Sequence, residues 1–379
     1  MDVNENSLDG FEPVAKIAVI GVGGAGNNAV NRMLDENIDN VEFYVANTDM
    51  QMLSLSKAPN RIILGAETTK GLGAGGNPEI GRKAAEESID QLKEVIKDKD
   101  MLFIACGEGG GTGTGAAPVI AKLSKELGVL TVAIVTRPFN FEGSKKKQIS
   151  IKGLEELSKE VDSIIIVSND KLLYHESDNF FIDAFAEADG VLAKSVKTVA
   201  DIILTPYSMN LDFADVRNIL KDSGVALIGY GSASGPNKAV DAAKNTLTCP
   251  LLDTGIKGAK KCLIAISCGT TVTMKDINKA IEYINYAAGG DTDVKVALNK
   301  NPALGDEMVI SVIATGFSNS DEIINDQTPY TYNDNSEELS GNNEDQNSEI
   351  NSESDEDDII PNFLNDDWFE FYSILWLNI

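Results

Sequence analysis

The chain has 379 residues, 42% of them hydrophobic, and a formal net charge of −27 at pH 7. This length suffices for two ordinary domains, and no apolar run approaches the ~20 residues of a membrane-spanning helix. Residues 1–12 are polar and acidic and should be flexible, so we expect neither a signal peptide nor an Arg-rich transit peptide. Four scattered cysteines are typical of a reduced, cytosolic protein.

Strands and helices are predicted to alternate in the first half of the chain. Helices are expected near 27–36, over 77–96, from Ala116 onward and over 143–160. Such alternation predicts an α/β fold with a doubly wound, mostly parallel sheet. Apolar, β-branched runs predict its strands over 14–20, 41–47, 61–64, 101–105, 129–135 and 163–167.

A long helix is predicted from about Asn179 to Leu204, because apolar residues recur there at spacings of three and four. Gly190 is mildly inconsistent with this helix. We expect residues 179–205 to be the spine between two domains. The apolar stripe comprises Phe181, Phe185, Ala188, Leu192, Val196, Val199 and Ile203.

A smaller α/β domain is predicted after this helix, over residues 206–317. Residues 318–357 are rich in Asn, Ser, Asp and Glu, which predicts a disordered acidic linker. Residues 318–379 hold 17 of the 59 acidic residues and none of the 32 Lys and Arg residues, so we expect no nucleic-acid binding. The strands of the second domain are expected at 225–230, 262–266, 294–298 and 308–315, and its helices at 212–221, 237–247 and 273–287.

Three glycine-rich loops, at 21–26, 71–76 and 109–115, lie near the ends of predicted strands. Five glycines in the last loop leave its backbone N–H groups open to a ligand, and the helix after it would point its positive dipole end at the same place. The loop lacks the Walker A lysine, so a bound phosphate would be neutralised by backbone dipoles and a metal ion. A flexible turn is the plain alternative.

Residues 21–26 also satisfy the G-x-G-x-x-G fingerprint of dinucleotide-binding proteins, and Asp49 lies about where its acidic residue is expected. A nicotinamide-dependent oxidoreductase is therefore the alternative from another reaction class. One dinucleotide needs one pyrophosphate loop, however, whereas three loops at the strand ends of one sheet can surround a triphosphate.

Residues 14–317 resemble the tubulin/FtsZ family, and FtsZ in particular, because its motifs occur here in the family's order. The resemblance implies a Rossmann-like GTPase domain over 13–178, a long central helix and a C-terminal activation domain over 206–317. The motifs are GVGGAGNNAVNRM (21–33), Asn47-Thr48-Asp49, TTKGLGAGGNPEIG (68–81), GGGTGTGAAP (109–118), TRPFNFEG (136–143), NLDFADVR (210–217) and VIATGF (312–317).

The resemblance also implies a GTP site. Residues 24–28 and 111–114 would contact the phosphates, and 73–76 would close over the γ-phosphate. Glu142 would reach the ribose, and Asn169 the guanine edge or the sugar. Phe185 would stack on guanine, and Asp189 would accept hydrogen bonds from its N1–H and amino group. The implied set is Gly23, Gly24, Ala25, Gly26, Asn27, Asn28, Gly73, Ala74, Gly75, Gly110, Gly111, Thr112, Gly113, Thr114, Gly115, Glu142, Lys146, Asn169, Phe185 and Asp189.

Asp212 and Asp215, with Asn210, are the implied catalytic residues. Spaced three apart, the two carboxylates would share one face of a first helical turn, and ordinary helix capping is the alternative role. By resemblance, this loop enters the nucleotide site of the next subunit, where the carboxylates orient or polarise the attacking water. Each subunit would then hold half of a catalytic site, and hydrolysis would require polymerisation.

Two residues depart from the family pattern. Lys146 stands where an arginine is usual, which turns a bidentate contact into a point charge. Glu108 stands where an apolar residue is more usual, and its carboxylate would weaken nucleotide binding unless it points away or helps to hold the metal. A scaffold that binds GTP and polymerises but hydrolyses poorly is therefore a second hypothesis.

Residues 358–364 resemble the short FtsZ peptide that docks onto membrane-tethering partners, but an apolar, aromatic end follows it, from Trp368 to Ile379. Three interpretations of this end remain open: contact with a membrane interface, insertion into a partner's groove, or a silent terminus.

Together, these features predict a GTPase with GTP or GDP and Mg²⁺ as cofactors and no assigned metal ligands. It should polymerise head to tail into cytoplasmic filaments at the division site, the Z ring, under the inner membrane. The expected partners are the chain itself and, through residues 358–379, membrane-tethering and regulatory division proteins.

Overall fold

The computed structural model describes residues 15–36, 38, 40–173, 181–204, 209, 211–249, 255–318 and 323–324, with the side chains of the central helix described from Asp189 onward. The predicted N-terminal segment 1–12, the residue Asn210, the terminal peptide 358–379 and nearly all of the linker lie outside these residues.

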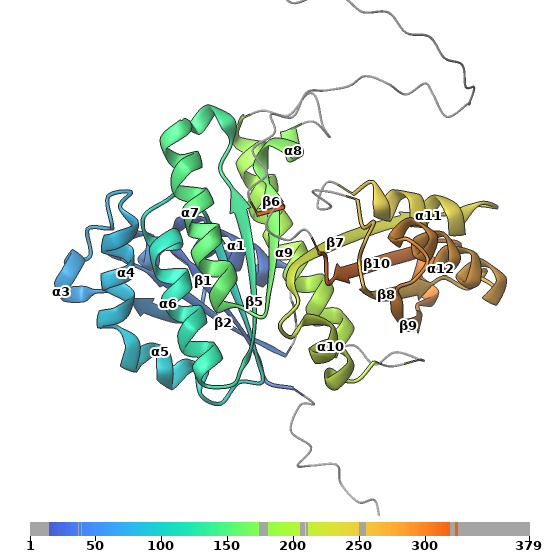
Figure 1. Cartoon of the computed structure of the whole chain (residues 1–379), viewed down its shortest axis with the longest axis horizontal. Coiled ribbons are helices and arrows are strands. Elements are labelled where there is room, and N and C mark those ends of the chain that lie inside the picture. Colours follow the sequence, from blue (N-terminus) through green and yellow to red (C-terminus); the bar gives the residue numbers. More distant parts are fainter. Residues whose placement is uncertain are drawn as a thin grey trace, which may run out of the picture. The chain divides into compact units, whose positions relative to one another are not determined.

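Ten strands of the described chain form one sheet, in the order β3-β2-β1-β4-β5-β6-β7-β10-β8-β9 (Figure 1). The strands from β3 to β7 are parallel, although β6 and β7 share only two residue pairs. β10 runs antiparallel to both β7 and β8. The predicted mostly parallel α/β sheet is therefore confirmed. The strands are β1 Ile17–Val22, β2 Val41–Asn47, β3 Asn60–Ile63, β4 Met101–Gly107, β5 Leu130–Arg137, β6 Ser163–Ser168, β7 Gly224–Ala233, β8 Lys261–Cys268, β9 Asp293–Lys300 and β10 Met308–Thr315.

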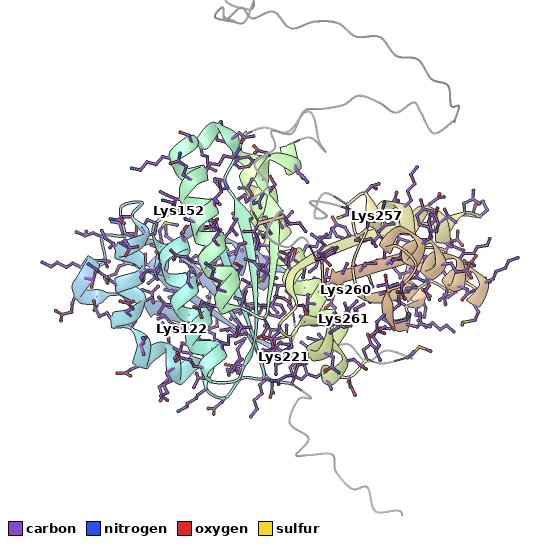
Figure 2. All side chains as sticks on the ribbon, viewed as in Figure 1. Lys122, Lys152, Lys221, Lys257, Lys260 and Lys261 are labelled. Carbon is purple, nitrogen blue, oxygen red and sulfur yellow. The ribbon has the colours of Figure 1, made fainter. Side chains whose placement is uncertain are left out.

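Helices connect most of these strands. Figure 2 labels lysines on several of the elements, among them Lys122 on α6, Lys152 on α7 and Lys261 at the start of β8. The helices are α1 Gly23–Asp35, α2 Met50–Leu55, α3 Ala66–Thr69, α4 Pro78–Glu87, α5 Ile89–Ile96, α6 Thr112–Glu126, α7 Ser144–Glu160, α8 Asn169–Leu173, α9 Phe181–Leu204, α10 Phe213–Leu220, α11 Lys238–Leu247 and α12 Met274–Ala288, with 3-10 turns η1 Asn140–Glu142 and η2 Pro302–Leu304.

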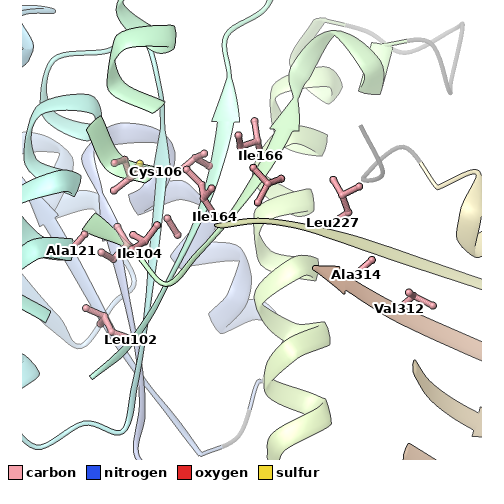
Figure 3. Packing of buried hydrophobic residues seen from close by; sticks show 14 of the residues in the cluster. Leu102, Ile104, Cys106, Ala121, Ile164, Ile166, Leu227, Val312 and Ala314 are labelled. Atoms are coloured by element: carbon pink, nitrogen blue, oxygen red, sulfur yellow. The ribbon is translucent and has the colours of Figure 1, made fainter. Parts of the chain in front are cut away.

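The sheet has a hydrophobic cluster on each side, because successive strand residues point to opposite faces. On β4, Leu102, Ile104 and Cys106 belong to the cluster that includes residues of α4–α7, α11 and α12. Figure 3 shows that this cluster continues from β4 to β10. The alternate residues of β4 belong to a second cluster with α1, α9 and α10. Helices thus cover both faces, as a doubly wound sheet requires.

The central helix α9 is 24 residues long and spans roughly 36 Å at about 1.5 Å per residue. Leu192, Val196 and Val199 of its predicted apolar stripe are fully buried. Gly190 lies beside Arg32 of α1, because a Cβ on Gly190 would stand 3.4 Å from the guanidinium Nη1. The described structure around Gly190 gives no steric reason for a glycine at this position.

Three predicted helix boundaries were wrong. The helix expected near 27–36 is α1, which begins at Gly23, inside the first glycine-rich loop. The helix expected over 77–96 is two helices, α4 and α5, which meet at Ser88. The Ser88 hydroxyl accepts a hydrogen bond from Gly65 N at 3.0 Å, the kind of side-chain bond that competes with a regular helix. The helix α6 begins at Thr112, inside the glycine-rich loop, and not at Ala116. The short helices α2, α3 and α8 were not predicted.

Candidate nucleotide-binding site

A cavity of about 280 Å³ lies at the carboxyl ends of the parallel strands β1, β4, β5 and β6. It stands where the sheet order turns from β1 towards β4, the crevice in which open α/β sheets bind ligands. Its lining residues are Val22, Gly23, Gly24, Ala25, Gly107, Glu108, Gly110, Gly111, Thr112, Gly113, Thr136, Pro138, Glu142, Lys146, Asn169 and Asp189.

Two helices begin at this cavity, α1 at Gly23 and α6 at Thr112. Neither helix has a side-chain N-cap or an acidic residue in its first turn. Their first N–H groups therefore lack the usual side-chain partners, and both positive dipole ends lie at the cavity. This arrangement suits an anion with several oxygens, such as a di- or triphosphate.

Glycine allows the two loops to approach each other. Gly23 has φ +71°, and a Cβ there would stand 3.0 Å from Gly113 N. A Cβ on Gly113 would in turn stand 2.6 Å from Gly107 O. Larger residues would separate the loops, so these glycines keep the two helix starts side by side.

Hydroxyl groups hold the last glycine-rich loop in place. The Thr112 and Thr48 hydroxyls hydrogen-bond to each other at 2.6 Å, which ties the start of α6 to the residue after β2. Gly109 N donates to Thr114 Oγ1 at 2.9 Å. Thr114 is buried and does not line the cavity, so it supports the loop from within.

Next to the end of β6 and beside α9, Asn169 and Asp189 also line the cavity. Asn169 is buried, and its Oδ1 has no hydrogen-bond partner among the described residues. Burial raises the pKa of Asp189 to about 6, although the nearby Arg32 charge and a hydrogen bond with Asn28 oppose the rise. Two acceptors thus remain here for the N–H groups of a base.

Family comparisons agree with this geometry. The model of the tubulin/FtsZ family GTPase domain matches residues 16–176, and that of the FtsZ family C-terminal domain matches residues 224–318. A cell division protein FtsZ from Mycoplasmopsis pulmonis is 48% identical over 322 residues, 85% of this chain and 82% of that protein. The chain belongs to the tubulin/FtsZ family of GTPases.

Solved structures show the same fold. An FtsZ dimer from M. jannaschii matches with a TM-score of 0.75 and 38% identity, over 80% of this chain and 89% of that one. CetZ1 from Haloferax volcanii, a GDP-bound monomer, matches with a TM-score of 0.71 and 22% identity, over 81% of this chain and 96% of that one, which is a likeness of fold alone. The predicted tubulin/FtsZ fold is confirmed.

The cavity of this FtsZ-family protein brings together most of the residues predicted to bind GTP. Gly26, Asn27, Asn28 and Gly115 do not line it. A Cβ on Gly26 would collide with Ala105 O, and one on Gly115 with Pro78 O, so these two glycines pack helices closely against β4 and α4. Asn28 instead reaches Asp189. Phe185 lies in α9, but its side chain is outside the described residues.

The loop 73–76 does not line the cavity but lies beside it. A Cβ on Gly111 would stand 2.9 Å from Ala74 Cβ and 2.8 Å from Asn77 N. Gly73 N also donates to Thr48 O at 3.1 Å. The loop is thus adjacent to the start of α6, where a ligand that extends beyond the cavity would meet it.

Glu142 and Lys146 form an ion pair at the cavity wall. Lys146 Nζ donates to Glu142 Oε2 at 2.7 Å, and Phe139 N donates to Glu142 Oε1 at 2.9 Å. The Glu142 carboxylate is therefore fixed within its own turn. The Lys146 side chain is 51% exposed and can turn from this pair towards an anion.

Asp49, the acidic residue of the dinucleotide alternative, caps α2. Its Oδ1 accepts from Gln51 N at 2.8 Å and from Met52 N at 3.3 Å. The role in helix capping and the family match together favour the guanine nucleotide over the nicotinamide dinucleotide.

The predicted catalytic aspartates do not lie at this cavity. Asp212 caps α10, since its Oδ1 accepts from Asp215 N at 2.8 Å. Asp215 forms an ion pair with Lys295 of β9, at 3.5 Å between Oδ1 and Nζ. Met209 and Leu298 of β9 exchange two backbone hydrogen bonds of 3.2 Å. This loop follows the carboxyl end of α9, whereas Asp189 is on the amino-terminal half of the same helix.

The sequence analysis missed several residues at the site. Val22, Gly107, Thr136 and Pro138 line the cavity without having been assigned to it. Thr136 and Pro138 belong to the motif TRPFNFEG, from which only Glu142 was taken, so the signal was present. Lys295 belongs to no motif. The register of β9 places it beside Asp215, which the local sequence does not show.

No helix in the described part of the chain is long and apolar enough to cross a membrane.

Proposed function

We propose that this FtsZ-family GTPase binds GTP in the cavity at the ends of β1 and β4 and hydrolyses it only after head-to-tail assembly. The observation that carries the proposal is the separation of two half-sites along α9. The phosphate-binding helix starts lie in one half, and Asp212 and Asp215 stand at the start of α10, beyond the carboxyl end of α9.

In the first half-site, the N–H groups at the starts of α1 and α6 bind the phosphates, and Asp189 and Asn169 recognise the base. Asp189, as a carboxylate, accepts hydrogen bonds from the N1–H and the 2-amino group of guanine. Adenine lacks both donors on the corresponding edge, so Asp189 selects GTP over ATP. The residues proposed to bind are those of the predicted set that line the cavity, with Gly73–Gly76 meeting the γ-phosphate at its edge.

In the second half-site, Asp212 and Asp215, with Asn210, orient the water that attacks the γ-phosphorus, and GDP leaves with the bridging oxygen. Positioning and charge stabilisation supply most of the acceleration in such transfers. Among the described residues, no group of three or more His, Cys, Asp or Glu side chains could hold a metal. In this proposal Mg²⁺ would be held mainly by phosphate oxygens and water, with helix dipoles adding to the neutralisation.

The separation of the two halves supports assembly between subunits. A subunit whose loop completes its neighbour's site makes a heterologous contact, and such contacts give open filaments when the rotation does not close. The related M. jannaschii FtsZ is described as a dimer, and the M. pulmonis relative as a cell division protein. We place the filaments in the cytoplasm at the division site, as the Z ring under the inner membrane, with residues 358–379 contacting membrane-tethering and regulatory proteins. The proposed division of the chain is a GTP-binding domain over 13–178, the central helix and an activation domain over 206–317.

The test is phosphate release from GTP and from ATP, with Mg²⁺, over a series of protein concentrations. We expect turnover per molecule that is selective for GTP and rises steeply above a threshold concentration. Turnover that is flat with concentration would mean a self-contained active site. GTP-dependent filaments in electron micrographs with only slow phosphate release would favour the scaffold that hydrolyses poorly.

A further inference from the structure

Glu108 has its carboxyl group buried beside the phosphate-binding loop. The residue follows β4 directly, and its N donates to Thr136 O of β5 at 2.9 Å, so its backbone is fixed between two central strands. The side chain is 5% exposed. Cys106 Sγ lies 3.8 Å from Oε1, and Oε2 has no hydrogen-bond partner among the described residues.

The neighbouring helix α7 leaves space for this carboxyl group. A Cβ on Gly153 of α7 would collide with Glu108 Oε2 and with Thr114 Cγ2. Ser150, three residues earlier on the same helix face, is buried, and its Oγ also lacks a partner among the described residues. The chain therefore accommodates the carboxyl group here without offering it a cation.

A short chain of contacts joins Glu108 to the loop. The Glu108 carboxyl group lies beside the Thr114 side chain, since a Cβ on Gly153 would meet both Glu108 Oε2 and Thr114 Cγ2. The Thr114 Oγ1 accepts from Gly109 N, and Gly109 has φ +92°, the turn that leads into the loop. Glu108 thus lies directly against the residue that holds this turn.

Charge at Glu108 acts on the nucleotide as well. The acids that line the cavity are Glu108, Glu142 and Asp189, and its one lining cation, Lys146, is paired with Glu142. An ionised Glu108 would add a buried negative charge close to the phosphates, and buried charges are poorly screened by salt.

The surroundings favour the neutral acid. Burial raises the pKa of Glu108 to about 7, although hydrogen bonds with Thr114 and Cys106 oppose the rise, and the Glu156 charge adds to it. Cys106 stays a thiol, because burial raises the pKa of its sulfur well above the usual range. Glu156 of α7 is paired with Arg82 of α4.

We propose that Glu108 sets the guanine-nucleotide affinity of this protein through its protonation. The neutral acid adds no charge to the cavity, whereas the buried carboxylate repels the phosphates and weakens the binding of GDP and GTP. The inference rests on the proposed function, since it assumes that the phosphates occupy this cavity.

The test is the dissociation constant of GDP, measured by calorimetry on the full chain from pH 6 to pH 8.5. Glu108→Gln keeps the size and neutrality of the protonated acid. We expect the wild type to lose about tenfold in affinity between pH 6 and pH 8 relative to Glu108→Gln, as the fraction of neutral acid falls through its pKa. The phosphates of GDP titrate equally in both proteins, so the ratio isolates Glu108.

Two further variants keep the test decisive. Glu126→Gln changes an exposed glutamate at the far end of α6 and should follow the wild-type profile. Glu108→Met, the apolar replacement, should be as flat as Glu108→Gln, and thermal melts at each pH verify that it is folded. Parallel profiles for the wild type and Glu108→Gln would overturn the inference and leave the proposed GTP site standing. A lack of GDP binding by every protein at every pH would overturn the proposed function, and the inference with it.

Discussion

The cavity and the loop that carries Asp212 lie towards opposite ends of α9, and they differ in which groups still lack partners. At the cavity, two helix starts have no side-chain caps, and Asn169 Oδ1 has no partner among the described residues. At the loop, Asp212 caps its own helix and Asp215 is paired with Lys295. The cavity is therefore organised to receive a ligand, whereas the loop is organised to hold its own shape.

This difference has a physical reason. Backbone dipoles and a fixed cavity stabilise a bound anion without rearrangement, so binding needs no second subunit. A catalytic carboxylate that lay beside the phosphates in the same chain would repel them at every stage of binding. In the proposed function, carboxylates that lie outside the cavity would let the nucleotide bind first and meet them only on assembly.

The substitution Asp212→Ala should abolish the proposed catalytic role of the loop and leave nucleotide binding in the cavity unchanged. It has the largest expected effect. We expect GTP turnover to fall by roughly 100-fold or more, as for the loss of a group that directs the attacking water. The dissociation constant of GDP at low protein concentration should stay within about twofold, because Asp212 does not line the cavity. Phosphate release and calorimetry measure the two quantities. Asp241→Ala, in the first turn of α11, is the matched control and should leave both unchanged. Unchanged turnover in Asp212→Ala would leave this residue as a helix cap only.

The substitution Asp189→Asn should weaken nucleotide binding in the cavity and leave the loop of Asp212 unchanged. Hydrogen bonds to a charged group are worth ~1.5–3 kcal/mol, so we expect GDP to bind about 10- to 100-fold more weakly. The amide can donate where the carboxylate accepts, so xanthosine diphosphate, with a 2-oxo group in place of the amino group, should lose less or gain. Equal losses for both nucleotides would contradict base recognition by Asp189.

The same residue predicts a limit at low pH. The pKa of Asp189 is raised to about 6, so its carboxylate, the double acceptor, disappears as the pH falls below that value. The affinity of the wild type for GDP should therefore fall from pH 7 to pH 5 relative to that of Asp189→Asn, because Glu108 and the phosphates of GDP titrate in both proteins. Calorimetry at both pH values measures the dissociation constants. An equal change in affinity in the two proteins would mean that another group causes the loss of affinity at low pH.

Part of this comparison could be predicted from the sequence. The bounds of β2 and β10 agree with the predicted strands, because continuous apolar runs mark them. The start of α6 could not be found this way, because glycines are poor helix formers. Here Gly113 and Gly115 are needed for close approach to β4 and α4, which the local sequence does not show.

Other features depend on residues far apart in the chain. Glu108 stood out as unusual, but the direction of its side chain depends on Gly153 of α7, to which no motif points. The capping role of Asp212 was foreseen as an alternative, since it needs only the residues that follow. The trans role of the same loop came from resemblance alone and stays a prediction.

Glu108→Gln should also change stability, by a smaller amount and only at high pH. A glutamate in the unfolded chain ionises near pH 4.5, whereas folded Glu108 keeps its proton to about 7. Between these values the folded state binds more protons, so the free energy of unfolding falls as the pH rises and levels off above 7. The variant lacks this loss, which is on the order of 3 kcal/mol. Urea denaturation at pH 5 and pH 8 should show a gain for Glu108→Gln at pH 8 only, and equal differences at both values would contradict the burial of a titrating carboxyl group.

Lys295→Met has the smallest expected effect and sharpens the comparison at the loop. Lys295 and Leu298 are both on β9, so one strand supplies the cation beside Asp215 and the backbone bonds to Met209. The pair is partly exposed, and such pairs contribute only ~0.2–1 kcal/mol, so folding should change little.

If the lysine orients the Asp215 carboxylate for the neighbouring subunit, turnover should fall about two- to fivefold with unchanged GDP affinity, and Lys295→Arg should restore it. Lys279→Met, on the exposed face of α12, is the control. A loss that Lys295→Arg does not restore would mean that the size of the side chain matters and its charge does not, and no loss at all would mean that the ion pair does not orient Asp215 for turnover.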